Sequence, residues 1–262
     1  MIAPRERPAG PSPGQPARRT RPDFVIGIPA RDEEALIGSS IDSVLASAGA
    51  LDGPGSVRLV VACDSCSDAT PSIARAVARV DPRVEVIEGD WRSAGSCRAA
   101  AIRHALRDAG CAASLSDVWV ATTDADTVVP AGWLASHAAH WSHGDHAVAG
   151  VVDLLEEHDA VRAVFGRHYA LGHDSHGHVH GANLGIRADA YLAVGGFPPV
   201  EVAEDHVLWH ALRHAGYTCR SSVALRVATS ARLAGRAVGG FADTLRELMG
   251  DRLDEQDTAA TA

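Results

Sequence analysis

Two carboxylates one position apart, Asp124 and Asp126, carry the clearest chemical signal in the chain. They end the stretch Val-Trp-Val-Ala-Thr-Thr-Asp-Ala-Asp-Thr at residues 118–127. The apolar part of this stretch predicts a buried strand, and side chains alternate along an extended chain, so both carboxylates can point the same way. The carboxyl end of a strand is also where open α/β sheets bind ligands. Neighbouring like charges repel each other unless a cation compensates them, and Mg²⁺ or Mn²⁺ takes oxygen ligands of this kind.

The same Asp-x-Asp pattern is also typical of a turn whose carboxylates are simply solvated. The pair alone does not separate a metal site from a turn. The elements around it have to decide between the two interpretations.

Composition favours one large α/β domain, because the 262 residues are 46% hydrophobic. The net charge of -9 argues against nucleic acid or an anionic membrane as partner, although a local basic pocket for phosphate is compatible with it. Five cysteines, an odd number, include a single Cys63-x-x-Cys66 pair without the second pair that a zinc site needs. We therefore expect reduced thiols and a cytoplasmic location. No apolar run reaches the roughly 18 residues of a transmembrane segment.

The order of elements predicts a mostly parallel sheet flanked by helices. Residues 1–22, rich in Pro, Gly and Arg, are predicted to be a disordered arm, residues 23–250 one domain, and residues 251–262 a polar tail. Strands are expected at 24–28, 57–62, 84–87 and from 118, separated by helices, then at 147–155, 181–186 and 223–227. Further helices are expected at 130–141, at 188–194, from 204, and from 239. Neither a Gly-x-Gly-x-x-Gly nor a P-loop motif follows the first strand, which disfavours a Rossmann dinucleotide site and a P-loop NTPase.

Six short motifs, taken in order, resemble the family 2 glycosyltransferases of GT-A fold. Each is weak alone, but their order and spacing together are specific, and they favour the metal-site interpretation of the Asp pair. They are Ile28-Pro-Ala-Arg-Asp-Glu33, Cys63-Asp-Ser-Cys-Ser-Asp-Ala-Thr70, Thr123-Asp-Ala-Asp126, Gly181-Ala-Asn-Leu-Gly-Ile186, Gly195-Gly-Phe197 and Glu204-Asp205.

The resemblance implies transfer of a sugar from a nucleotide-diphosphate donor to a hydroxyl of a small or glycan acceptor, with inversion and with Mn²⁺ or Mg²⁺. It places Asp126 as the direct metal ligand, with Asp124 in the same motif and nearer the ribose. Asp205 matches the general base, which would take the acceptor proton. The residues implied for the nucleotide are Pro29, Arg31, Glu33, Asp64 and Arg98.

Three positions depart from the family pattern. Cys63 stands where an Asp is common, Ala99 where an Asn is common, and Thr229 near a late His that completes the metal shell in many relatives. We therefore expect fewer protein ligands on the metal, with water filling in. The Gln/Arg-x-x-Arg-Trp motif and membrane helices of processive synthases are absent, which favours transfer of single sugars to a soluble acceptor.

Two alternative functions stay open from the sequence. A sugar-1-phosphate nucleotidyltransferase would carry a Gly-rich basic loop after the first strand, where this chain has Arg31-Asp-Glu-Glu34. A degenerate protein that binds a nucleotide sugar without catalysis is the other alternative. The histidines at 168, 173, 176, 178 and 180 are interpreted as an acceptor-facing loop rather than a second metal site.

Overall fold

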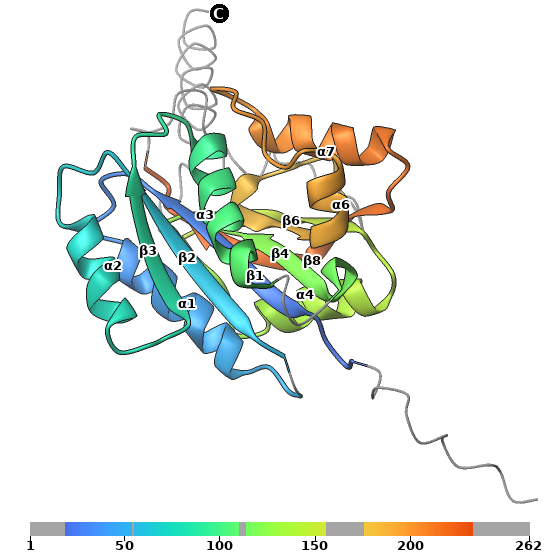
Figure 1. The fold of residues 1–262 in the computed structure, drawn as a ribbon, viewed down its shortest axis with the longest axis horizontal. Helices are drawn as coiled ribbons and strands as arrows, with labels where there is room; N and C mark the ends of the chain where they lie inside the picture. Colours follow the sequence, from blue (N-terminus) through green and yellow to red (C-terminus); the bar gives the residue numbers. More distant parts are fainter. Residues whose placement is uncertain (1–18, 54, 110–113, 156–175, 233–262) are drawn as a thin grey trace, which may run out of the picture.

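The protein is one eight-stranded sheet with helices on both faces, seen in a computed structural model that describes residues 19–53, 55–109, 114–155 and 176–232. The strand order is β3-β2-β1-β4-β7-β6-β8-β5 (Figure 1). The strands are β1 Asp23–Ala30, β2 Val57–Asp64, β3 Val84–Gly89, β4 Val118–Thr122, β5 Thr127–Val128, β6 Ala147–Leu154, β7 Leu184–Arg187 and β8 Cys219–Thr229.

The first four strands form the parallel half of the sheet. β1 pairs in parallel with both β2 and β4, and β2 with β3. Their apolar runs are buried almost throughout, as expected for parallel strands covered on both faces. Because the strands run the same way, their carboxyl ends lie at one edge of the sheet, which we call the carboxyl edge.

The direction of the chain reverses in the second half. β7 runs antiparallel between β4 and β6, so the residues that precede β7 reach the carboxyl edge rather than those that follow it. β8 runs parallel to β6, and its last residue pairs with the short strand β5. The end of β8 therefore also lies at the carboxyl edge.

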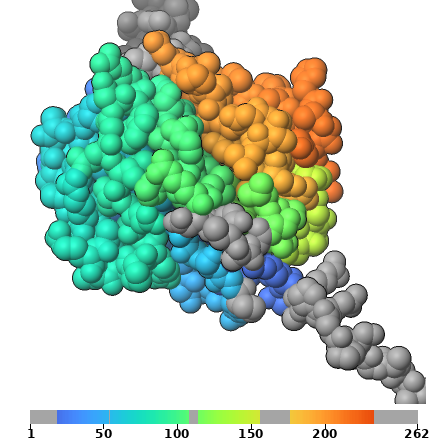
Figure 2. Space-filling view, in the orientation of Figure 1, coloured from blue at the N-terminus to red at the C-terminus, as the bar shows by residue number. Residues whose placement is uncertain are grey.

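Two hydrophobic cores flank the sheet. One lies beneath α1 and α4, around Ile37, Ile41 and Trp133, and the other beneath α3, α6 and α7, around Ile102, Tyr191 and Leu208. Figure 2 shows the surface of the α3 region directly beside that of the α6 region. The helices are α1 Ile37–Gly49, α2 Thr70–Ala78, α3 Ala94–Ala109, α4 Trp133–Ser142, α6 Ala188–Ala193 and α7 Glu204–His214, with 3-10 turns η1 Leu115–Asp117 and η2 Gly181–Asn183.

The predicted mixed α/β architecture is confirmed, with differences in detail. Residues 181–183 form a 3-10 turn instead of the start of a strand, β8 begins four residues before the expected Val223, and β5 is not predicted by any apolar run. The predicted helix from 239 and most of both predicted termini lie outside the described residues, so the domain boundaries stay a prediction. Within the described parts of the chain, no helix is long and apolar enough to cross a bilayer.

Candidate active site

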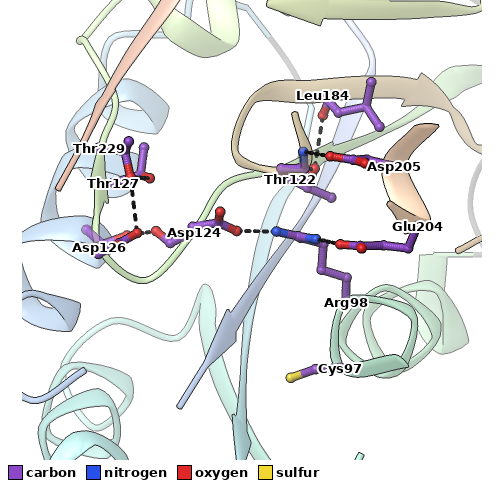
Figure 3. Close-up of polar contacts among 12 residues, drawn as sticks. Cys97, Arg98, Thr122, Asp124, Asp126, Thr127, Leu184, Glu204, Asp205 and Thr229 are labelled. Atoms are coloured by element: carbon purple, nitrogen blue, oxygen red, sulfur yellow. Dashed lines mark hydrogen bonds and ion pairs between the residues drawn. The ribbon is translucent and has the colours of Figure 1, made fainter. Parts of the chain in front are cut away.

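The two predicted metal ligands lie in a tight turn that follows β4. β4 ends at Thr122, so the expected strand alternation does not place Asp124 and Asp126. Instead, the carbonyl oxygen of Asp124 accepts hydrogen bonds from the Thr127 amide at 3.1 Å and from the Ser40 hydroxyl at 2.9 Å. The turn directs Asp124 toward Arg98 and Asp126 toward Thr229 (Figure 3).

Asp126 is the more deeply buried of the two carboxylates. Burial, and then the charge of Asp124, raises its pKa to about 6, although Arg232 opposes this. Its Oδ1 accepts a hydrogen bond from Thr229 at 3.2 Å, and its Oδ2 lies 2.9 Å from the guanidinium of Arg232. Thr229, at the place where the family's histidine is missing, therefore still contacts the Asp126 carboxylate.

Arg232 connects the metal motif to the predicted nucleoside loop. Besides Asp126, it contacts both carboxylate oxygens of Glu33, which is buried at 6% exposure. This ion pair raises the pKa of Arg232. No sequence motif contains Arg232, because its partners Glu33 and Asp126 lie far from it along the chain and meet it only in the fold.

Arg98 was expected to face the nucleotide, and that contact stays a prediction. In the structure its side chain is only 6% exposed and lies between Asp124 and Glu204. Burial lowers the pKa of Arg98, but Asp124 and Glu204 outweigh this effect and raise it above its ordinary value. Arg98 is buried because it lies on the face of α3 that also carries the buried Ala101, Ile102 and Ala105.

Glu204, which the sequence placed only in the Glu204-Asp205 motif, is a buried partner in this ion pair. Helical periodicity could have found it, because Glu204, Leu208 and Leu212 recur at intervals of four and all are buried. Asp205, one residue further on, is half-buried. Its Oδ2 accepts the Gly181 amide at 2.8 Å, and its Oδ1 accepts the His206 amide at 2.7 Å.

The remaining nucleotide residues lie at the ends of β1 and β2. Pro29 is half-buried within β1, and Arg31 is exposed just after it. Asp64 is buried at the end of β2, where its Oδ1 accepts the backbone amides of Trp91 and Arg92 at 2.6 and 3.2 Å. Asp64 therefore holds the turn between β3 and α3, and its predicted contact with a base stays a prediction.

A second group of possible cation ligands joins the same two loops. Asp32, Cys66 and Asp68 hold ligand atoms within 4.8 Å of one another. These carboxylates already accept local hydrogen bonds: Asp32 from Ser67, and Asp68 from Thr70 and Glu34. The arrangement explains how the loops after β1 and β2 are fixed.

Of the histidine segment, His168 and His173 lie outside the described residues. The rings of His176, His178 and His180 stack in sequence, with centroids 5.9 Å apart in each pair. Asn183, in the Gly181–Ile186 motif that follows the histidines, has a structural role, because its side chain forms hydrogen bonds with Val151, Leu225 and Trp133.

The carboxyl edge therefore brings together two charged sets with different capabilities. Asp126 and Asp124 offer oxygen atoms to a hard cation. Asp205, held by backbone amides, offers a carboxylate that can accept a proton. Arg98 and Glu204 join the two sets below the surface.

Comparisons with solved structures define the class of fold. A mannosyltransferase from Pyrobaculum calidifontis, in complex with GDP-Man and Mn²⁺, is similar with a TM-score of 0.61 at 20% identity, over 88% of this chain and 62% of that one. S. aureus TarS gives a TM-score of 0.57 at 16% identity, over 80% and 37% of the two chains. GalNAc-T7 with UDP, GalNAc and Mn²⁺ gives 0.58 at 10% identity, over 80% and 43%. The chain has the GT-A fold of these glycosyltransferases, and it spans less than two thirds of their length.

The family follows from the sequence itself. Residues 25–181, more than half of the chain, match the family model described as glycosyl transferase family 2. The chain belongs to this family. No curated protein matches its sequence.

Proposed function

We propose that the protein transfers a sugar from a nucleoside-diphosphate donor to an acceptor hydroxyl, with a divalent cation at Asp126 and Asp124 and with Asp205 as general base. The observation that carries this proposal is the meeting of the Asp124–Asp126 turn and the amide-held Asp205 at one edge of the sheet, joined through Arg98. The similar structures that contain GDP-Man or UDP support a donor of this class.

The residues present fit Mn²⁺ or Mg²⁺. Such a cation binds through one or two carboxylates and leaves room for water and substrate phosphate. The raised pKa of Asp126 reflects its burial and its repulsion from the charge of Asp124, and a bound cation would relieve that repulsion. A bound divalent cation would neutralise the charge that develops on the departing diphosphate. Because Arg232 contacts the Asp126 carboxylate, it has to give way where a metal binds there.

The chain's own residues account for the acceptor side. Asp205 keeps a fixed orientation because two backbone amides hold its two oxygens. In that position it can take the proton of an acceptor hydroxyl while the hydroxyl attacks the sugar. A single base opposite the departing diphosphate is the arrangement of an inverting transfer, and we propose that outcome.

Donor recognition is proposed for the loops after β1 and β2. Pro29, Arg31, Glu33 and Asp64 lie at the ends of neighbouring parallel strands, where open sheets bind ligands.

The described thiols of Cys63, Cys66, Cys97 and Cys219 are free, which agrees with a reducing compartment such as the cytoplasm.

Calorimetry tests the donor proposal directly. GDP and UDP are titrated into the wild type, Asp126→Ala and the surface control Asp153→Ala, each with and without Mn²⁺. We expect wild type and Asp153→Ala to bind one of the two in a Mn²⁺-dependent way, and Asp126→Ala to lose at least tenfold in affinity. Equal affinity in wild type and Asp126→Ala would remove Asp126 from the donor site.

A further inference from the structure

Arg98 and Glu204 have no place in the donor or base chemistry described above, yet both are buried. Their side chains are 6% and 10% exposed, and they come from different elements, α3 and the start of α7. Burying charges is costly unless they are paired and hydrogen-bonded, and removing one partner leaves an uncompensated charge. The Arg98 guanidinium, on α3, contacts Asp124 in the turn after β4 and Glu204 at the start of α7. Charge-assisted hydrogen bonds therefore link these three segments.

We propose that Arg98 and Glu204 are positioning residues that fix the base Asp205 relative to the donor motif. Figure 3 shows the row of contacts from Asp124 through Arg98 to Glu204, with Asp205 beside it. This inference rests on the proposed role of Asp205 and adds what holds it in place. It assigns a function to the ion pair that the transfer chemistry leaves unused.

Gly181 is the link between the ion pair and the base. Its backbone packs against the Arg98 guanidinium so closely that a Cβ atom there would overlap the guanidinium carbon. Its amide donates to Asp205 Oδ2 at 2.8 Å, while its carbonyl accepts the Thr122 hydroxyl at 2.7 Å. Arg98 thus supports the residue that orients the Asp205 carboxylate.

The start of α7 is arranged around the same contact. A Cβ atom on Gly95 would lie 2.7 Å from Glu204 Cβ and Cγ, so only a glycine lets α3 approach Glu204 this closely. Ala203, directly before Glu204, has a φ of 60°, a left-handed conformation that costs an alanine about 1 kcal/mol. This path of the chain turns Glu204 inward and leaves Asp205 at the edge.

Arg98 Nε is buried without a hydrogen-bond partner among the described residues. Buried polar atoms are rarely left in that state. If Arg98 served only stability, we would expect its Nε to have a hydrogen-bond acceptor. Instead, the two terminal nitrogens of the guanidinium each contact one carboxylate, so the guanidinium fixes the distance between Asp124 and Glu204.

The test uses Glu204→Gln and Arg98→Lys in the full chain. Glutamine keeps the shape of Glu204 and leaves Arg98 paired with Asp124, whereas lysine keeps the charge of Arg98 but loses the fork that reaches two carboxylates. The matched controls are Glu201→Gln, an exposed glutamate three residues earlier, and Arg107→Lys, an exposed arginine on the same helix. Asp205→Asn is the reference for loss of the base.

Two readouts are measured on each protein. The first is hydrolysis of GDP-mannose and UDP-glucose with Mn²⁺, with water as acceptor. We expect kcat to fall at least tenfold in both variants while the donor KM stays within threefold. The second needs no donor: amide hydrogen exchange at Gly181 should become at least tenfold faster in both variants, and remain as in wild type in the controls.

The outcomes separate the two proposals. If Asp205→Asn hydrolyses donor at the wild-type rate, the base assignment fails, and Gly181 exchange alone then decides the positioning proposal. Unchanged Gly181 exchange in Glu204→Gln and Arg98→Lys overturns positioning, as does a loss confined to KM. If one of the two variants does not fold, the other carries both measurements.

Discussion

Asp126 is a residue whose proposed role conflicts with the stability of the fold. Burial and the charge of Asp124 raise its pKa to about 6, so the ionised form is disfavoured in the native state relative to the unfolded chain. A group with a raised pKa stabilises the native state when protonated, and this contribution is lost as the pH rises through the native pKa. At neutral pH the protein therefore keeps a carboxylate that destabilises it.

Asp126→Asn should accordingly stabilise the protein without metal at pH 7.5. The shift from 3.8 to about 6 sets a ceiling of about 3 kcal/mol, which the loss of the Arg232 contact reduces. Near pH 4 the gain should disappear, because the wild-type carboxyl is then protonated as well. Urea unfolding at both pH values, with the exposed Asp153→Asn as control, measures this. A variant that is less stable than wild type at pH 7.5 would contradict the prediction.

Arg232 occupies the place at Asp126 where a cation is proposed. We expect Arg232→Gln to bind Mn²⁺ about tenfold more tightly than wild type when no donor is present, because the metal no longer competes with a guanidinium. Electron paramagnetic resonance of free Mn²⁺ measures the affinity. Arg226→Gln, at an exposed ion pair with Asp153, is the matched control and should behave as wild type. Equal affinity in all three proteins would show that Arg232 does not compete.

At the scale of elements, the antiparallel direction of β7 determines that the residues before it, including Gly181, lie at the site. Its reversed direction brings η2 to the carboxyl edge, where Gly181 meets Arg98, Asp205 and Thr122. The sequence motif predicted an apolar strand here and gave no sign of its direction. Strand direction depends on pairing between distant segments, which local patterns do not encode.

Gly181→Ala should test how closely these elements pack. The added methyl group overlaps the Arg98 guanidinium, and overpacking of this kind typically costs about 1–3 kcal/mol. Gly177→Ala, in the same segment with open space around it, should cost less than about 0.5 kcal/mol. Chemical unfolding of the two variants beside wild type measures the difference. Similar stabilities for the two variants would mean that the segment moves away from Arg98 at little cost.

The sequence predicted the parallel half of the sheet and the positions of the main motifs, because apolar runs and acidic residues at their ends are local features. It did not show which face of a helix is buried. The motifs alone did not predict that Arg98 and Glu204 both lie at buried positions of their helices, where they pair with each other. Arg232 could not be found, because its partners Glu33 and Asp126 meet it only through the order of strands in the sheet.

At the scale of the whole molecule, a histidine is buried beside Trp119 and Trp133 of the core beneath α1 and α4. His137, on α4, is fully buried, and its Nδ1 accepts a hydrogen bond from the indole of Trp119 at 3.2 Å. Its ring packs edge-on against Trp133, with centroids 4.8 Å apart. Burial, and to a lesser degree the nearby His140, lowers the pKa of His137 to about 3. This histidine is therefore neutral in the native state throughout the physiological range.

The lowered pKa predicts how the fold responds to acid. A histidine whose pKa is lower in the native than in the unfolded state adds stability above its ordinary value of 6.5, and this is lost as the pH falls toward 3. The loss is up to about 1.4 kcal/mol per pH unit, or about 3 kcal/mol between pH 6.5 and 4.5. In His137→Gln, where a neutral amide replaces the imidazole, the drop in stability between pH 7.5 and 4.5 should be smaller by about that amount. His143→Gln, an exposed histidine just after the same helix, should keep the full wild-type drop. Asp126 titrates in the opposite direction, but it does so equally in all three proteins, so the comparison isolates His137. Urea unfolding of the three proteins at both pH values provides the measurement, and an undiminished drop in His137→Gln would show that acid acts on this fold elsewhere.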